Sequence, residues 1–126
     1  MELDGTITFF YYDDLAKATR FYLEVMGFTK VIDIPLAKVF KVHGGSHVGL
    51  VDGHAGYLRH ADDKPVMLSW FSDDIDGWYR RLLENGVEVE QPPMRQPYLE
   101  MRTMLFRDPE GYLLEILQWL KKPYGS

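Results

Sequence analysis

LFRDPEGYLLEILQ, residues 105–118, is the stretch that decides the fold of this chain. It is typical of two apolar strands joined by a turn over Asp108–Gly111, because Asp, Pro and Gly favour turns. The second strand contains one carboxylate, Glu115. A charge inside an apolar strand is costly unless another group binds it, so Glu115 indicates either a ligand site or a salt bridge.

The rest of the chain repeats one order of elements twice. In each half a strand is followed by a helix. An aspartate, Asp14 or Asp74, is expected to cap the start of the helix, and a glycine, Gly27 or Gly86, is expected to end it. Three further strands follow each helix. The predicted strands cover residues 6–12, 28–34, 37–42 and 47–51, then 66–72, 87–90, 100–107 and 112–118.

Two segments are predicted to lie outside this repeat. Gln91–Tyr98 contains three prolines and is expected to be a loop rather than a regular strand. Residues 53–65 are polar and are expected to be a linker. We therefore predict an α+β fold, a single domain over residues 1–126, with two βαβββ modules at about 1–52 and 66–120.

Composition narrows the classes of function. The net charge of −5 disfavours a nucleic-acid partner, and the absence of cysteine excludes disulfides, thiolate metal sites and cysteine nucleophiles. No apolar run has membrane-spanning length, so no membrane partner is expected. The acidic start, Met1–Gly5, lacks the apolar core of a signal peptide, and a cytoplasmic location is the expectation.

With this repeat, the chain resembles the vicinal oxygen chelate superfamily, which includes glyoxalase I, extradiol dioxygenases, fosfomycin-resistance enzymes and bleomycin-resistance proteins. The resemblance implies that two curved sheets form a cup. The residues that carry it are Asp14-Leu15, Phe21-Tyr22, Met26-Gly27-Phe28, Asp73-Asp74-Ile75-Asp76, Gly86-Val87-Glu88-Val89, Met101-Arg102-Thr103 and Phe106 to Glu115.

Metal-dependent members of that superfamily place one ligand on the first and one on the last strand of each module. The corresponding positions here are Ile7, Gly49, Met67 and Glu115. Only one of these four residues is a usual ligand for a divalent ion. We therefore expect no metal and no other cofactor. The fallback is a site rebuilt from Glu115 and His47, whereas the other histidines, in a turn and in the linker, are expected to be solvated.

The partner of Glu115 is predicted from the turn. A four-residue turn over Asp108–Gly111 sets Met104 opposite Glu115 and places Arg102 diagonal to it, on the same face. Arg102 then either forms an ion pair with Glu115 or, together with it, anchors a polar ligand. Both alternatives stay open.

The same counting places Phe40 opposite Gly49 and gives the predicted lining of the cup. These residues either form a small-molecule pocket or fill a core between the sheets. No catalytic residue is predicted. The candidate ligand-binding residues are Phe9, Tyr11, Phe40, His47, Met67, Ser69, Phe71, Arg102, Met104 and Glu115.

The expected function is binding of a small apolar or aromatic molecule without a metal, in a protein that forms a homodimer as bleomycin-resistance proteins do. The alternative is a metal-dependent lyase or dioxygenase that uses Glu115 and His47. A third possibility is a structural or regulatory fragment with a filled cup. The sequence is compatible with a cup formed within one chain and with a cup formed across a dimer.

Overall fold

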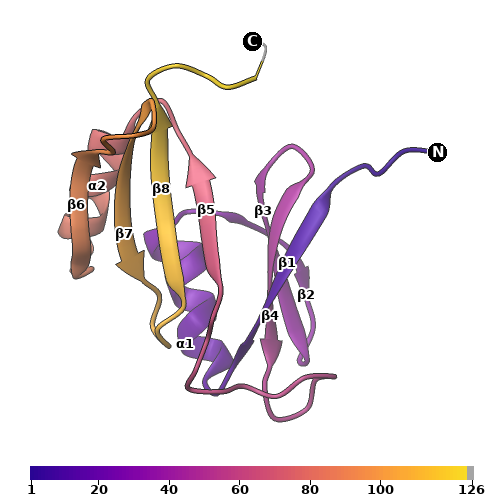
Figure 1. The fold of residues 1–126 in the computed structure, drawn as a ribbon. Helices are drawn as coiled ribbons and strands as arrows, with labels where there is room; N and C mark the ends of the chain where they lie inside the picture. Colours follow the sequence, from indigo (N-terminus) through magenta and orange to yellow (C-terminus); the bar gives the residue numbers. More distant parts are fainter. Residues whose placement is uncertain (125–126) are drawn as a thin grey trace. The chain divides into compact units, whose positions relative to one another are not determined.

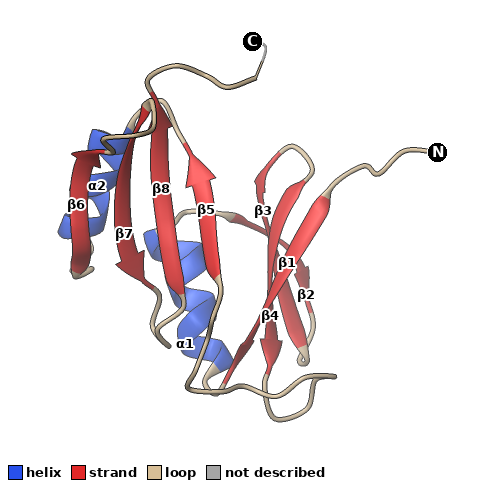
Figure 2. Ribbon diagram, in the orientation of Figure 1, coloured by secondary structure: helices blue, strands red, loops and turns tan. Residues whose placement is uncertain are grey.

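The computed structural model describes residues 1–124 and divides the chain into two units, Met1–Asp63 and Lys64 onward. Each unit contains one four-stranded mixed sheet and a helical segment (Figures 1 and 2). This arrangement confirms the predicted α+β class with two βαβββ modules. No helix in residues 1–124 combines the length and apolar character that crossing a membrane requires.

The first unit has the strand order β1-β4-β3-β2, in which only β1 and β4 are parallel. The Asp14 side chain accepts a hydrogen bond from Lys17 N and caps the helix, which continues into a π-helical turn, η1. The elements are β1 (Thr6–Tyr12), α1 (Leu15–Arg20), η1 (Phe21–Val25), β2 (Thr29–Asp33), β3 (Ala37–His43) and β4 (Ser46–Asp52).

The core of the first unit lies between its helices and one sheet face. Tyr12, Tyr22 and Phe40 are fully buried there, and the Tyr12 hydroxyl donates to the Tyr22 hydroxyl at 3.2 Å. Strand residues that alternate with this core point to the other face, which is why Ile7 and Phe9 stay partly exposed. The unit therefore has one packed face and one open, largely apolar face.

The second unit repeats this topology with the strand order β5-β8-β7-β6, and β5 and β8 are parallel. Asp74 caps α2 by accepting a hydrogen bond from Gly77 N at 3.0 Å. Ile75 and Leu82 of this helix are fully buried, and α2 packs against β6, β7 and β8 (Figure 1). The elements are β5 (Met67–Phe71), α2 (Ile75–Glu84), β6 (Val89–Arg95), β7 (Met101–Arg107) and β8 (Leu113–Trp119).

The proline-rich stretch differs from its prediction. β6 extends through Pro92 and Pro93 to Arg95, so the expected loop over Gln91–Tyr98 is wrong for its first part. Proline cannot donate to a β ladder, but β6 lies at the edge of its sheet and its pairing shifts between Gln91 and Met94. The prolines occupy this irregular part of an edge strand.

The β7–β8 turn contains one residue more than predicted. Arg107 pairs with Leu113, and Asp108 N donates to Tyr112 O at 3.0 Å, so the loop covers residues 108–112. The buried Asp108 carboxylate accepts hydrogen bonds from Glu110 N and Tyr112 N at 3.0 and 3.1 Å. Leu105 therefore lies opposite Glu115, and the prediction of Met104 there is wrong.

The β3–β4 pairing is altered by a bulge. His43 pairs with Ser46 at the turn, but the register shifts between Lys41 and His43. Val39 consequently lies opposite Gly49, and Phe40 lies opposite Val48. Because a one-residue shift exchanges the faces of a strand, Phe40 packs in the helix-side core, where its ring centroid is 6.3 Å from that of Tyr22. Its predicted place opposite Gly49 is wrong.

Replacing Asp108 with alanine tests the role of the turn. We expect Asp108→Ala to lower the free energy of unfolding by about 2 kcal/mol, because two backbone N–H groups lose a buried acceptor. Asp108→Asn keeps an acceptor oxygen and should lose less. Urea denaturation of the three proteins measures the difference, and equal stability of Asp108→Ala and the parent would contradict this account.

Candidate functional site

The open face of the second sheet carries a polar pair on neighbouring parallel strands. Ser69 of β5 pairs in register with Glu115 of β8, and the Ser69 hydroxyl donates to Glu115 Oε1 at 2.7 Å. Glu115 is half-buried and Ser69 is exposed. Glu115 is thus hydrogen-bonded to a neutral hydroxyl, and this contact does not neutralise its negative charge.

Apolar and aromatic side chains surround this pair on the same face. Met67 and Phe71 precede and follow Ser69 on its side of β5, with exposed fractions of 48% and 62%. The Phe71 ring centroid lies 6.3 Å from that of Trp119 and 6.0 Å from that of Tyr124. The result is a partly exposed apolar surface around the Glu115 carboxylate, bordered by an aromatic cluster.

Arg102 lies on the opposite face of this sheet. Its guanidinium donates to both carboxylate oxygens of Asp76, on α2, at 2.9 and 3.0 Å. This bidentate contact lowers the pKa of Asp76 and raises the pKa of Arg102. The predicted Arg102–Glu115 pair is therefore wrong, and Met104, which is fully buried on the same helix side, is also misplaced by the one-residue register error.

The open face of the first sheet holds Phe9, Tyr11 and His47, as predicted. Phe9 pairs in register with Gly49, and a Cβ built on Gly49 would lie 2.5 Å from a ring carbon of Phe9. The Phe9 ring thus covers Gly49. His47 Nδ1 is 3.2 Å from the carbonyl oxygens of Thr6 and Gly45, so the backbone orients this ring.

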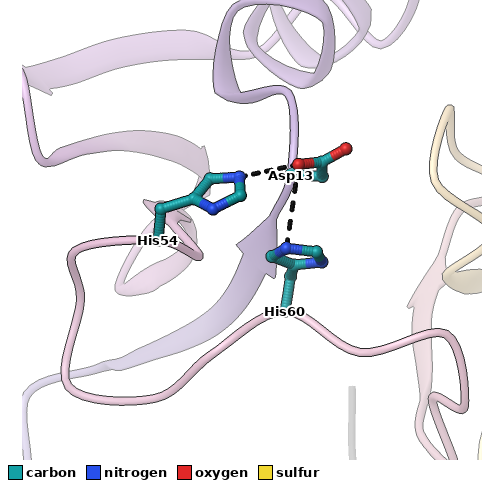
Figure 3. A group of neighbouring side chains, drawn as sticks. All are labelled: Asp13, His54 and His60. Atoms are coloured by element: carbon teal, nitrogen blue, oxygen red, sulfur yellow. Dashed lines mark hydrogen bonds and ion pairs between the residues drawn. The ribbon is translucent and has the colours of Figure 1, made fainter.

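A second group of polar side chains lies at the end of β1 (Figure 3). His54 Nε2 is 2.6 Å and His60 Nε2 is 3.7 Å from Asp13 Oδ1. The hydrogen bond with Asp13 is the main cause that raises the pKa of His54, and the charge of Asp52 adds to it. The prediction treated both histidines as solvated linker residues and missed this group.

The order of the strands could have predicted that Asp13 and the linker histidines lie together. β1 and β4 are parallel and end together at the Tyr12–Asp52 pair, so Asp13 and the segment after Asp52 leave the sheet at the same edge. Parallel pairing of these strands, once assumed, brings the linker histidines near Asp13. Gly53 N donates to Tyr12 O at 2.7 Å, so this part of the predicted linker is bound to the first unit.

Comparison with known proteins decides the family. A model of the Glyoxalase/Bleomycin resistance protein/Dioxygenase superfamily matches residues 6–116. The chain belongs to this superfamily. The resemblance inferred from the sequence is confirmed, and this assignment covers lyases, dioxygenases and transferases without selecting among them.

A curated relative matches part of the chain. Metallothiol transferase FosB from Shouchella clausii (strain KSM-K16) is 43% identical over 51 residues. The match covers 40% of this chain and 35% of that protein, so it spans about a third of the relative's length.

Solved structures match nearly the whole chain. Lactoylglutathione lyase from Agrobacterium tumefaciens has 25% identity and a TM-score of 0.77, covering 94% of this chain and 95% of that one. A superfamily protein from Nocardioides has 24% identity and a TM-score of 0.78, covering 100% and 91%. TioX from Micromonospora sp. ML1 has 22% identity and a TM-score of 0.78, covering 92% and 98%. The last two similarities concern the fold alone.

The residues at the ligand positions of the superfamily do not fit a divalent ion. Ile7 has no donor atom, Gly49 has no side chain and is covered by Phe9, and Met67 offers only a thioether. Glu115 is the single oxygen donor and is engaged by Ser69.

A double-mutant cycle tests the observed ion pair. Asp76→Asn and Arg102→Gln should show favourable coupling at pH 7, whereas Arg102→Gln and Glu115→Gln should be additive. Because the pKa of Asp76 is lowered in the folded protein, the coupling is present above its unfolded pKa of about 3.9 and is lost as the pH falls further. Coupling between Arg102 and Glu115 instead would restore the predicted register.

Proposed function

We propose that the protein binds a small apolar or aromatic molecule that carries an amine, on the open face of its second sheet. The observation that supports this proposal is the Ser69–Glu115 pair within an exposed apolar surface. Small-molecule sites are mostly apolar and contain a few polar groups that orient the ligand. Glu115 supplies that polar group.

The chemistry of the pair favours a cationic or hydrogen-bond-donating ligand. Ser69 donates to Oε1 of Glu115, which orients the carboxylate. The second oxygen, Oε2, is a charged acceptor suited to an ammonium group. Arg102 is bound to Asp76 on the other face, and Arg107, which shares the face of Glu115, is bound to Glu90 and to Gly111 O, so both guanidinium groups are already engaged. Phe71 and Met67 provide the apolar contact area.

A metal-dependent enzyme is the alternative, with a site rebuilt around Glu115 and His47. The partial match to a metallothiol transferase and the similarity to a lactoylglutathione lyase favour it. Against it stand the residues at the family's ligand positions, where Ile7, Gly49 and Met67 replace usual donors. Binding without a metal at these positions therefore remains our proposal.

Ligand binding is tested with two probes of equal ring system and opposite charge, tryptamine and indole-3-acetate, by isothermal titration calorimetry. Tryptamine should bind more tightly. Glu115→Gln should weaken tryptamine binding by about tenfold, since a charge-assisted hydrogen bond contributes about 1.5 kcal/mol or more. Phe71→Ala should weaken binding of both probes, because it removes apolar contact area.

Glu84→Gln is the matched control, because Glu84 is an exposed carboxylate at the end of α2. It should leave both affinities unchanged. Tighter binding of the acetate, or equal tryptamine affinity of Glu115→Gln and the parent, would count against the amine anchor. An activity that needs an added metal and is lost in both Glu115→Gln and His47→Ala would favour the alternative.

We further propose that the protein forms a homodimer. Each sheet has two edge strands, β1 and β2 in the first unit and β5 and β6 in the second, each paired on one side only. Of these, β1 and β5 carry exposed aromatic residues, Phe9 and Phe71. Edge strands and exposed apolar faces of this kind favour association with another protein surface.

Light scattering after size-exclusion chromatography tests the dimer and should give about twice the chain mass of 14.7 kDa. A mass of one chain at micromolar concentration would contradict the proposal.

A further inference from the structure

We propose that Asp13, His54 and His60 form a binding site for a divalent transition-metal ion, with zinc as the reference ion. The site lies within the first unit, at the end of β1 and in the segment after β4 (Figure 3). It is separate from Ile7, Gly49, Met67 and Glu115, the positions considered above. The inference does not depend on the proposed binding of small molecules.

The ligand atoms already converge. One atom from each of the three side chains lies within 4.8 Å of the other two. Figure 3 shows both imidazole rings directed at the same carboxylate oxygen, and their ring centroids are 4.7 Å apart. In a tetrahedral zinc site with bonds of about 2.0–2.1 Å, ligand atoms lie roughly 3.3 Å apart. The 2.6 Å separation of Asp13 Oδ1 and His54 Nε2 must then lengthen by about 0.7 Å, and the widest separation, which is at most 4.8 Å, must shorten by up to about 1.5 Å. Rotation of the three side chains can supply these changes.

The donor set suits zinc and similar ions. Two imidazole nitrogens and one carboxylate oxygen are usual ligands for Zn²⁺, Ni²⁺ and Co²⁺, whereas Ca²⁺ and Mg²⁺ prefer oxygen ligands. The 2.6 Å contact between Asp13 and His54 is a hydrogen bond, and a metal ion would replace the shared proton. Three protein ligands leave at least one coordination position for water.

The backbone holds His60 in place. His60 N donates to Gly53 O at 3.3 Å, and a Cβ built on Gly53 would lie 2.6 Å from His60 Cβ. The absence of a side chain at Gly53 therefore allows His60 to approach. His54 N donates to the Asp52 carboxylate at 2.9 Å, which fixes the other end of the segment.

Charge and access also fit a cation. Two carboxylates, Asp13 and Asp52, lie within hydrogen-bonding distance of His54, at 2.6 Å from its Nε2 and 2.9 Å from its backbone N, so the site lies beside two negative charges. The exposed fractions of the side chains are 65% for Asp13, 58% for His54 and 33% for His60. An ion can thus enter from solvent without opening the fold.

The test uses the full chain, without a histidine tag, titrated with ZnCl₂ by isothermal titration calorimetry. We expect one ion per chain. His54→Ala and His60→Ala should each weaken binding by about tenfold or more, and Asp13→Asn should weaken it similarly. His43→Ala is the matched control, since His43 is an exposed histidine of the same unit outside the cluster, and it should bind zinc like the parent.

Three further measurements separate loss of the site from loss of the fold. Far-ultraviolet circular dichroism shows whether each variant is folded, and Gly53→Ala should weaken zinc binding while all three ligands remain. Co²⁺ should give visible absorption that is lost in His54→Ala.

Absence of one-to-one zinc binding would overturn the proposed site. Binding that survives in His54→Ala and His60→Ala but is lost in Glu115→Gln would also overturn it, and would place the ion at the family position instead.

Discussion

The buried carboxylate of Asp108 is the constraint on which the second unit depends. By accepting hydrogen bonds from Glu110 N and Tyr112 N, it closes a five-residue loop and fixes the pairing of β7 with β8. Because side chains alternate along a strand, this pairing decides which residues share the face of Glu115. It places Arg102 beside Asp76 and α2, and leaves Ser69 as the companion of Glu115.

The two units share a topology and differ in chemistry. Ser69 and Glu115 form a polar pair on the parallel strands of the second unit, and the same places in the first unit hold Phe9 and Gly49. There an aromatic ring covers a glycine, so these two positions carry no polar side chain. The repeat therefore preserves the scaffold, while the polar pair at these positions exists in the second unit only.

Local patterns predict most of the elements, but they miss the extension of β6 through Pro92 and Pro93 to Arg95. The strand over 6–12 and the caps Asp14 and Asp74 were predicted as observed, because alternation and capping are properties of neighbouring residues. Pairing between strands was harder, since one extra turn residue, Tyr112, and one bulge near Val42 each shifted a register. These two shifts account for the misplaced Arg102, Met104 and Phe40. The grouping of Asp13 with His54 and His60 depends on a parallel pairing and on a loop conformation that no periodicity encodes.

The contact between Phe9 and Gly49 also constrains how this chain could change over evolution. A side chain introduced at position 49 alone would meet the Phe9 ring, so the ring, which is 46% exposed, would have to rotate away from Gly49. Exchange of Phe9 for a smaller residue removes that obstacle. A substitution at position 49 is therefore accommodated more easily after position 9 has changed to a smaller residue than while Phe9 is present.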